Sequence, residues 1–339
     1  MPNVLIEKIT QMNLAWSREF LLTSPQRAEY RQLFPTEIAV TMCMDGRVNL
    51  PRWVKALFGL FTVFRNIGGK YCLGWPLMNS SISEWYNYVL SKGRRALLII
   101  TYHYSKSDRE LGCAGFNFDT QAAKQAALEF KLEVDRACSG TISTLLVGLE
   151  TDDEKMVIHG ADDSFLDVSE CEGLSESALR RRLSVLLPNI PGGTREDLMP
   201  LIRGNVEHMA DVHKTRKEPI HLHHNERVLA VGRGFSWLNN NNFALVIGPC
   251  DPDLDSAIVT AAEIIEDNWQ QGRIVGSGVL LVSTGYRHAY QRGLAISTSR
   301  YLAEFAMKHI RKKLPSMGDF FHPCVGVLCF DDHRFEECQ

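Results

Sequence analysis

Short, continuous apolar runs recur along the chain and alternate with longer stretches in which apolar and polar positions are mixed. In the first half the runs cover residues 38–42, 96–102 and 141–149, and stretches with helical spacing lie between them at 80–92 and 119–137. Short runs rich in β-branched side chains predict buried strands, whereas helical spacing over more than about ten residues predicts a helix. The alternation predicts a mainly parallel central sheet flanked by helices, because parallel neighbours need a crossover connection.

The second half repeats this order of elements. Its apolar runs at residues 227–232, 243–248 and 278–283 correspond in order to 38–42, 61–64 and 96–102, and mixed stretches at 256–269 and 300–311 take the places of the helices. The order and spacings agree although few identities do, and this pattern predicts an internal duplication.

We therefore predict an α/β fold of two tandem domains, each with a mainly parallel central sheet flanked by helices, preceded by a helical arm. The predicted parts are the arm at residues 1–36, a first domain at 37–160, a connector at 161–220 and the second copy at 221–339. The arm is predicted to hold two short helices, because prolines interrupt its helical spacing at positions 25 and 35. A length of 339 residues is enough for two domains of ordinary size.

A chemically distinctive motif, Cys43-Met44-Asp45-Gly46-Arg47, follows directly on the first predicted strand. In open α/β sheets, ligands bind beyond the carboxyl ends of the strands. The Cys43 thiolate is a suitable ligand for soft or borderline metals. Asp45 beside Arg47 should stay ionised, because an opposite charge favours the charged form. Taken alone, the motif is equally compatible with a buried structural cysteine followed by a surface ion pair.

The strand predicted at residues 96–102 runs into His103, and Cys113 follows in a glycine-containing loop. Two strand ends would then supply three metal ligands, namely Cys43, His103 and Cys113. Three protein ligands with one open position are typical of a catalytic zinc, whereas structural zinc sites are usually closed by four. The two halves of the pattern together favour one Zn²⁺ per chain over the purely structural alternative.

This arrangement resembles the β-class carbonic anhydrases, in which Cys-x-Asp-x-Arg ends one strand and a histidine and a cysteine follow another. The segment Phe64–Gly69 resembles that family's Arg-Asn-x-Gly segment, and Ser81–Leu90 resembles the helix before its histidine strand. Two features depart from the common pattern. Gly46 stands where serine or alanine is usual, and nine residues separate His103 from Cys113 instead of two. The long spacing is similar to the carboxysomal-shell branch, which joins an active domain to a degenerate second copy.

The resemblance implies reversible hydration of carbon dioxide to bicarbonate by zinc-bound hydroxide. Zinc lowers the pKa of its bound water towards about 7, so that hydroxide is present at neutral pH. Asp45 would accept the remaining hydrogen of the hydroxide, and Arg47 would hold Asp45 ionised and away from the metal. If Asp45 itself binds zinc, the fourth position is closed and the enzyme rests.

The second copy is predicted to bind no catalytic zinc, because other residues stand at the ligand positions. Gly232 lies near the place of Cys43, Gly285 near that of His103, and Ile296 near that of Cys113. The apolar strands remain, so this copy should fold and provide the surface that a second subunit gives in ordinary β-class dimers. The chain would then be a pseudo-dimer with one active site, and further assembly into a homodimer is compatible with it.

Three other functions stay open at the level of sequence. They are hydrolysis of carbon disulfide or carbonyl sulfide on the same scaffold, a non-catalytic zinc protein whose long ligand spacing disables the site, and a redox protein that uses Cys43 and Cys113 as a dithiol. The run His221-Leu222-His223-His224 is a second metal candidate, but no cysteine or acid lies beside it with a recognised spacing, so we expect no metal there. We expect a surface or packing role for His159, beyond a predicted hairpin.

Composition narrows the partners and the compartment. A net charge of −3 gives no reason to expect a nucleic acid or an anionic membrane as partner. No apolar run of about 18 residues and no signal-peptide pattern is present, so neither a spanning helix nor secretion is expected. Nine scattered cysteines fit a reducing compartment, which predicts a bacterial cytoplasmic location. The resemblance adds a carboxysome as the alternative. Association with a carboxysome shell or with Rubisco does not follow, because the large extra N-terminal domain of those relatives is not seen.

Overall fold

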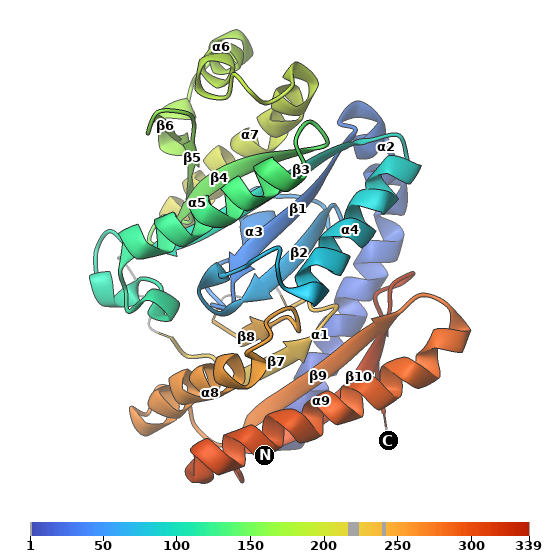
Figure 1. Cartoon of the computed structure of the whole chain (residues 1–339). Helices are drawn as coiled ribbons and strands as arrows, with labels where there is room; N and C mark the ends of the chain where they lie inside the picture. Colours follow the sequence, from blue (N-terminus) through green and yellow to red (C-terminus); the bar gives the residue numbers. More distant parts are fainter. Residues whose placement is uncertain (1, 216–223, 239–241, 339) are drawn as a thin grey trace.

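The first half of the chain forms a six-stranded sheet. The computed structural model describes residues 2–215, 224–238 and 242–338 (Figure 1). The strand order is β2-β1-β3-β4-β5-β6, with the first four strands parallel and the last two antiparallel. The strands are β1 (Thr36–Cys43), β2 (Phe61–Asn66), β3 (Arg95–Tyr104), β4 (Ile142–Glu150), β5 (Lys155–His159) and β6 (Phe165–Asp167).

Helices cover both faces of this sheet. The helices are α3 (Leu50–Trp53), α4 (Pro76–Ser91), α5 (Thr120–Ala137), α6 (Glu176–Leu186) and α7 (Gly192–Thr215). Apolar side chains of α4 and α5 pack on one face, and those of α3, α6 and α7 pack on the other. All eight residues of β1 are buried, as expected for a central parallel strand covered on both faces.

The second half forms a five-stranded sheet with the same order of its parallel strands. The order is β11-β10-β9-β7-β8, and only β11 is antiparallel to its neighbour. Its elements are β7 (Val228–Gly232), β8 (Ala244–Ile247), α8 (Leu254–Gln270), β9 (Gly278–Tyr286), α9 (Arg292–Lys313), β10 (Phe321–Cys329) and β11 (Phe335–Glu337). The sequence β8-β7-β9-β10 matches β2-β1-β3-β4, so the predicted fold class, two tandem mainly parallel sheets flanked by helices, is confirmed.

The N-terminal arm joins the two halves. Helix α1 (Pro2–Leu22) packs against the second sheet through an apolar cluster that contains Leu5, Ile9 and Trp16, and α2 (Ser24–Leu33) follows it toward the first half. The arm therefore holds two helices, as predicted, although α1 is longer than expected. None of the helices in the part of the chain that the structure describes is both long and apolar enough to cross a bilayer.

Two local details differ from the expected elements. The helix expected from residue 80 begins at Pro76, because proline is well suited to the first turn of a helix. The segment after Leu50 is only one helical turn, and Lys55 follows it with a left-handed φ of 50°, which ends the helix.

The predicted connector holds elements that pack on the first sheet. Strand β6 is its sixth strand, and residues of α6 and α7 share the apolar cluster of one of its faces. Asn205 of α7 is fully buried and spans three backbone groups. Its Nδ2 donates to the carbonyl oxygens of Trp53 at 3.1 Å and Glu154 at 2.9 Å, and its Oδ1 accepts from the Met156 N–H at 3.0 Å. The domain boundaries themselves stay a prediction.

Replacing Asn205 by alanine should lower the free energy of unfolding by roughly 3 kcal/mol or more, because buried backbone groups lose their partners at about 1–3 kcal/mol each. Chemical denaturation followed by circular dichroism measures this change. Asn79→Ala is the control, since Asn79 is exposed, and it should change the unfolding free energy by less than about 0.5 kcal/mol. Equal effects of the two substitutions would contradict the role assigned to Asn205.

Candidate metal centre

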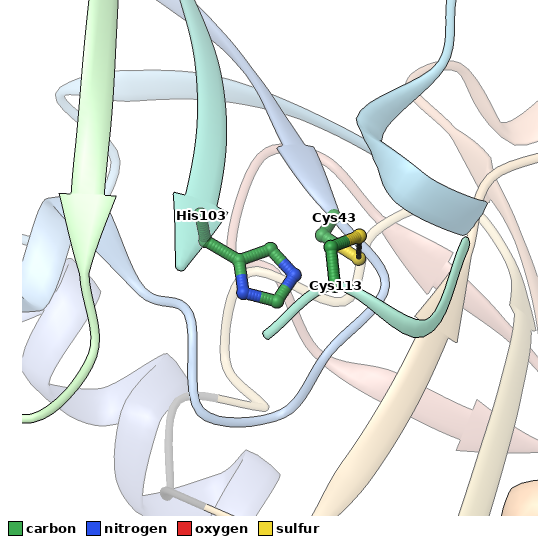
Figure 2. A group of neighbouring side chains, drawn as sticks. All are labelled: Cys43, His103 and Cys113. Carbon is green, nitrogen blue, oxygen red and sulfur yellow. Dashed lines mark hydrogen bonds between the residues drawn. The ribbon is translucent and has the colours of Figure 1, made fainter. Parts of the chain in front are cut away.

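The three predicted ligands converge from three separate segments. Cys43 is the last residue of β1, His103 is the last residue but one of β3, and Cys113 lies in the loop after β3. Because β1 and β3 are parallel neighbours, their carboxyl ends meet at one edge of the sheet. Figure 2 shows the three side chains pointing toward one another, and their ligand atoms all lie within 4.8 Å.

The geometry and burial of this trio fit a zinc ion. The Sγ atoms of Cys43 and Cys113 are 3.9 Å apart, close to the separation of about 3.8 Å that two Zn–S bonds of about 2.3 Å make in a tetrahedron. Both ring nitrogens of His103 are buried and have no hydrogen-bond partner among the described residues. Buried polar atoms are normally satisfied, and a metal at this position would give one of these nitrogens a partner.

The two thiols are hydrogen-bonded to each other. The hydrogen bond from Cys113 holds the pKa of the Cys43 thiol well below its usual range, against the effect of burial. The same hydrogen bond, together with burial, raises the pKa of Cys113 well above its usual range. Because metals bind thiolates, metal binding at this pair would displace thiol protons.

The loop segment that carries Cys113 packs closely against the glycines after β2. The carbonyl oxygen of Cys113 accepts hydrogen bonds from the N–H groups of Phe116 and Phe118, both at 3.0 Å. A Cβ atom on Gly115 would lie 2.7 Å from the backbone N and Cα of Gly68, which has a positive φ of 65°. The glycines therefore allow two backbones to approach, and this approach restrains the segment that follows Cys113.

Asp45 and Arg47 form a buried ion pair beside the ligands. Arg47 donates from Nη2 to Oδ2 of Asp45 at 2.6 Å and from Nε and its backbone N to Oδ1 at 3.0 and 2.8 Å. Burial alone would raise the pKa of Asp45, but the charges of Arg47 and His224 and the hydrogen bonds from Arg47 lower it overall. Asp45 is thus an ionised carboxylate, and its Oδ2 lies 3.8 Å from Nε2 of His103.

His224 and Glu226 complete the site from the second half of the chain, and our sequence reasoning did not find this role. His224 Nε2 lies 3.8 Å from Asp45 Oδ2, and its Nδ1 lies 3.1 Å from both carboxylate oxygens of Glu226. Burial lowers the pKa of His224, but the carboxylates of Glu226 and Asp45 together outweigh it and the pKa is raised overall. The three residues before His224 in its histidine-rich run lie outside the described residues.

Asp45, His224 and Glu226 also bring potential ligand atoms within 4.8 Å of one another. Arg47 already binds both carboxylate oxygens of Asp45. We therefore interpret this group as an ion-pair network that surrounds the site.

His159, for which we expected a surface or packing role, lies on strand β5. Its Nε2 lies 2.8 Å from the hydroxyl of Tyr102.

The turn that carries Asp45 is hydrogen-bonded to the edge of the second sheet. The carbonyl oxygens of Met44 and Gly46 accept from the N–H groups of Val246 at 3.0 Å and Asn242 at 3.2 Å. A Cβ atom on Gly46 would lie only 2.8 Å from the carbonyl oxygen of Ala244. This close approach explains why glycine stands here in place of the serine or alanine of the common motif.

The corresponding positions of the second sheet have no room for ligands. Gly232 has a φ of 125°, and a Cβ there would overlap the carbonyl oxygen of Ser283. A Cβ on Gly285 would overlap the ring of Phe330. Ile296 lies inside helix α9, so its expected correspondence to the loop residue Cys113 is wrong: the connection before α9 is much shorter than the loop before α5. Among the described residues, two groups of side chains could hold a metal ion: Cys43, His103 and Cys113, and Asp45, His224 and Glu226. Each group includes side chains from the first half of the chain.

Fold and site together define a class of protein: a two-sheet α/β chain whose described residues form one buried Cys-His-Cys centre next to an Asp–Arg pair. Comparison with known proteins narrows this class. Residues 82–178 match the family model of the carboxysome shell carbonic anhydrase catalytic domain. The chain is therefore similar to the carboxysome shell carbonic anhydrases, as the motifs predicted.

Three curated relatives, each named carboxysome shell carbonic anhydrase, align with parts of the chain. The protein of Halothiobacillus neapolitanus is 24% identical over 254 residues, which are 61% of this chain and 49% of the relative. That of Prochlorococcus marinus is 27% identical over 193 residues, 48% and 38% of the two chains. That of Hydrogenovibrio crunogenus is 43% identical over 72 residues, 19% and 14% of the two chains. The chain thus spans about half or less of these relatives' length.

Substituting Gly115 by alanine should weaken metal binding by about tenfold or more, because residues that orient a ligand typically contribute this much to affinity. The added Cβ must push the Cys113 segment away from Gly68. Zinc affinity measured by competition with a chromophoric chelator checks this expectation. Gly293→Ala serves as the control, since a Cβ there meets nothing within 4 Å. Unchanged zinc affinity in Gly115→Ala would contradict the close-packing argument.

Substituting Glu226 by glutamine should lower the pKa of His224, because the carboxylate that favours the imidazolium is removed. The raised pKa stabilises the fold below the pKa of histidine in the unfolded chain, and this stabilisation is lost as pH rises through the folded pKa. The stability difference between wild type and Glu226→Gln should therefore shrink as pH rises. Histidine NMR titration measures the pKa directly, with His159 as the internal reference. A constant His224 pKa would refute the coupling.

Proposed function

We propose that the chain is a zinc-dependent carbonic anhydrase that interconverts carbon dioxide and bicarbonate at one active site. The observation that carries this proposal is the convergence of Cys43, His103 and Cys113 beside the buried Asp45–Arg47 pair. The family-model match and the names of the relatives support the same activity. Zinc held by the three ligands would supply Lewis acidity that lowers the pKa of a coordinated water towards about 7.

Asp45 has the properties required to orient a water in the site. It is ionised, so it accepts hydrogen bonds and donates none. Arg47 fixes the carboxylate through both oxygens, so Asp45 has a defined direction when it accepts a hydrogen from the reacting water. The positive charge of Arg47 also keeps Asp45 ionised, because an opposite charge favours the charged form.

The second half, in this proposal, is the permanent partner of the active half. It supplies the hydrogen bonds to the Asp45 turn and places His224 next to the carboxylate. Two of its own ligand positions are glycines and Ile296 lies inside helix α9, so one zinc per chain is expected. The apolar cluster that contains Cys43, Met44 and Cys113 is formed mostly by second-half residues, which exclude water from one side of the site.

The relatives' names place those proteins in carboxysome shells, and we extend this setting to the present chain as part of the proposal. Co-purification with isolated shells supports this setting, and recovery of the chain only outside shells argues against it.

Asp45→Asn should lower carbon dioxide hydration by about a hundredfold or more while zinc stays bound, because the ionised acceptor is lost and the ligands are kept. Stopped-flow hydration and metal content are measured on the same purified sample. Cys43→Ala should lose both zinc and activity. Cys171→Ala is the matched control, since Cys171 is a free, buried cysteine of the first half that belongs to a different apolar cluster from Cys43 and Cys113.

Different results would overturn different parts of the proposal. Full activity in Asp45→Asn would remove Asp45 from the mechanism. One zinc per chain without hydration from about pH 7 to 9, where a zinc-bound water should ionise, would refute carbonic anhydrase activity and leave the metal site. Two zinc ions per chain would refute the single-site interpretation.

A further inference from the structure

The loop between His103 and Cys113 has little apolar packing to fix its course. Lys106, Ser107, Arg109 and Glu110 are exposed, and Leu111 is the loop's buried apolar side chain. No sheet partner follows Tyr104 in this segment, because β3 ends there. A ligand at the far end of such a loop needs another restraint, since an exposed loop without one samples many conformations.

Asp152, in the turn between β4 and β5, supplies three hydrogen bonds to the start of this loop. Its Oδ1 accepts from the Ser105 hydroxyl at 2.7 Å, and its Oδ2 accepts from the N–H groups of Lys106 at 2.9 Å and Ser107 at 2.7 Å. Burial alone would raise the pKa of Asp152, but these donors lower it overall. Asp152 is therefore a charged acceptor, and hydrogen bonds to a charged group are the stronger kind.

A chain of further hydrogen bonds carries this restraint along the loop. The Ser105 hydroxyl accepts from the Asp108 N–H at 3.1 Å, and the Asp108 carboxylate accepts from the Glu110 N–H at 2.9 Å. The carbonyl oxygen of Asp108 then accepts from the Leu111 N–H at 3.0 Å, two residues before Cys113. The hydrogen bonds thus connect Asp152 with Leu111, two residues before the ligand.

The turn that bears Asp152 is itself fixed. The carboxylate of Glu150, a fully buried residue, accepts from the N–H groups of Asp152 at 2.8 Å and Asp153 at 3.2 Å. The Thr151 N–H donates to the carbonyl oxygen of Tyr104 at 2.9 Å, at the point where β3 ends. Asp152 is therefore fixed by the hydrogen bond of its backbone to Glu150, while its carboxylate binds the loop.

We propose that Asp152 is a positioning residue for the metal ligand Cys113, acting through Ser105 and Asp108. Its importance for catalysis rests on the proposed function, but its effect on the position of Cys113 does not. The long spacing between His103 and Cys113 is then tolerated because the hairpin β4–β5 holds the added residues.

The second half offers a natural control for this inference. There the Phe330 N–H donates to the carbonyl oxygen of Tyr286 at 2.9 Å, as Thr151 does to Tyr104, which makes Asp331 the counterpart of Asp152. Oδ1 of Asp331 lies 3.6 Å from Nη1 of Arg287 in an exposed ion pair, and the connection beside it carries no metal ligand among the described residues. Its removal should leave the metal centre unchanged.

The test compares Asp152→Asn and Ser105→Ala with the controls Asp331→Asn and Asp153→Asn in the metal-free, full-length protein. The rate of alkylation of each cysteine is followed by mass spectrometry after trypsin digestion. Cleavage gives separate peptides for residues 32–47 and 110–124, which hold Cys43 and Cys113 as their only cysteines. We expect alkylation of Cys113 to become about tenfold faster in the two test variants, because hydrogen bonds to a charged acceptor are lost. Cys43 lies on strand β1, so its alkylation should not become faster than in the wild type; loss of its hydrogen bond with Cys113 would make it slower if anything.

A second readout is the rate at which bound zinc passes to a chelator, which should rise in the same two variants only. Equal acceleration at Cys43 and Cys113 would indicate general loosening and overturn the proposal, as would unchanged alkylation of Cys113. If the protein binds no zinc at all, the proposed function fails, while the alkylation rates still decide whether Asp152 positions Cys113.

Discussion

The buried charge of Asp45 is the constraint on which the rest of this structure depends. An isolated carboxylate in an apolar interior is strongly unfavourable, and removing one partner of a buried ion pair typically costs about 3–5 kcal/mol. Arg47 and His224 supply positive charge to Asp45, and Glu226 supplies negative charge to His224. Arg65 donates to the carbonyl oxygens of Cys43, Asp45 and Val48, and so fixes the turn itself. The site is therefore one network of charges drawn from both halves of the chain.

This network explains why the second half is needed even though it lacks metal ligands of its own. The second sheet keeps the strand order of the first but has glycine at two of the ligand positions. Its contribution is the edge of β8, which binds the backbone of the Asp45 turn, and the segment before β7, which brings in His224 and Glu226. A further contact joins Arg65 and Gly248, whose backbone groups are hydrogen-bonded at 2.8 Å. The two sheets thus meet edge to edge beside the metal ligands.

The strands, the repeat and the convergence of Cys43, His103 and Cys113 could be predicted from the sequence, because each depends on a local pattern of residues. A short apolar run predicts a buried strand, and parallel strands place their carboxyl ends together, so Cys43 and His103 could be assigned to one edge. His224 could not be placed in this way. Its contact with Asp45 joins residues far apart in the chain and depends on how the two sheets meet, which periodicity does not encode. The misplacement of Ile296 has a similar cause, since it assumed equal loop lengths in the two copies.

The glycine at position 232 makes the loss of the second site a one-way change. Its left-handed backbone and its contact with the Ser283 carbonyl leave no volume for any side chain. A substitution of cysteine for this glycine would therefore disrupt two strands before it gave a ligand. The duplicated half can therefore support the reactive centre of the first half, but no single substitution at position 232 can give it a centre of its own.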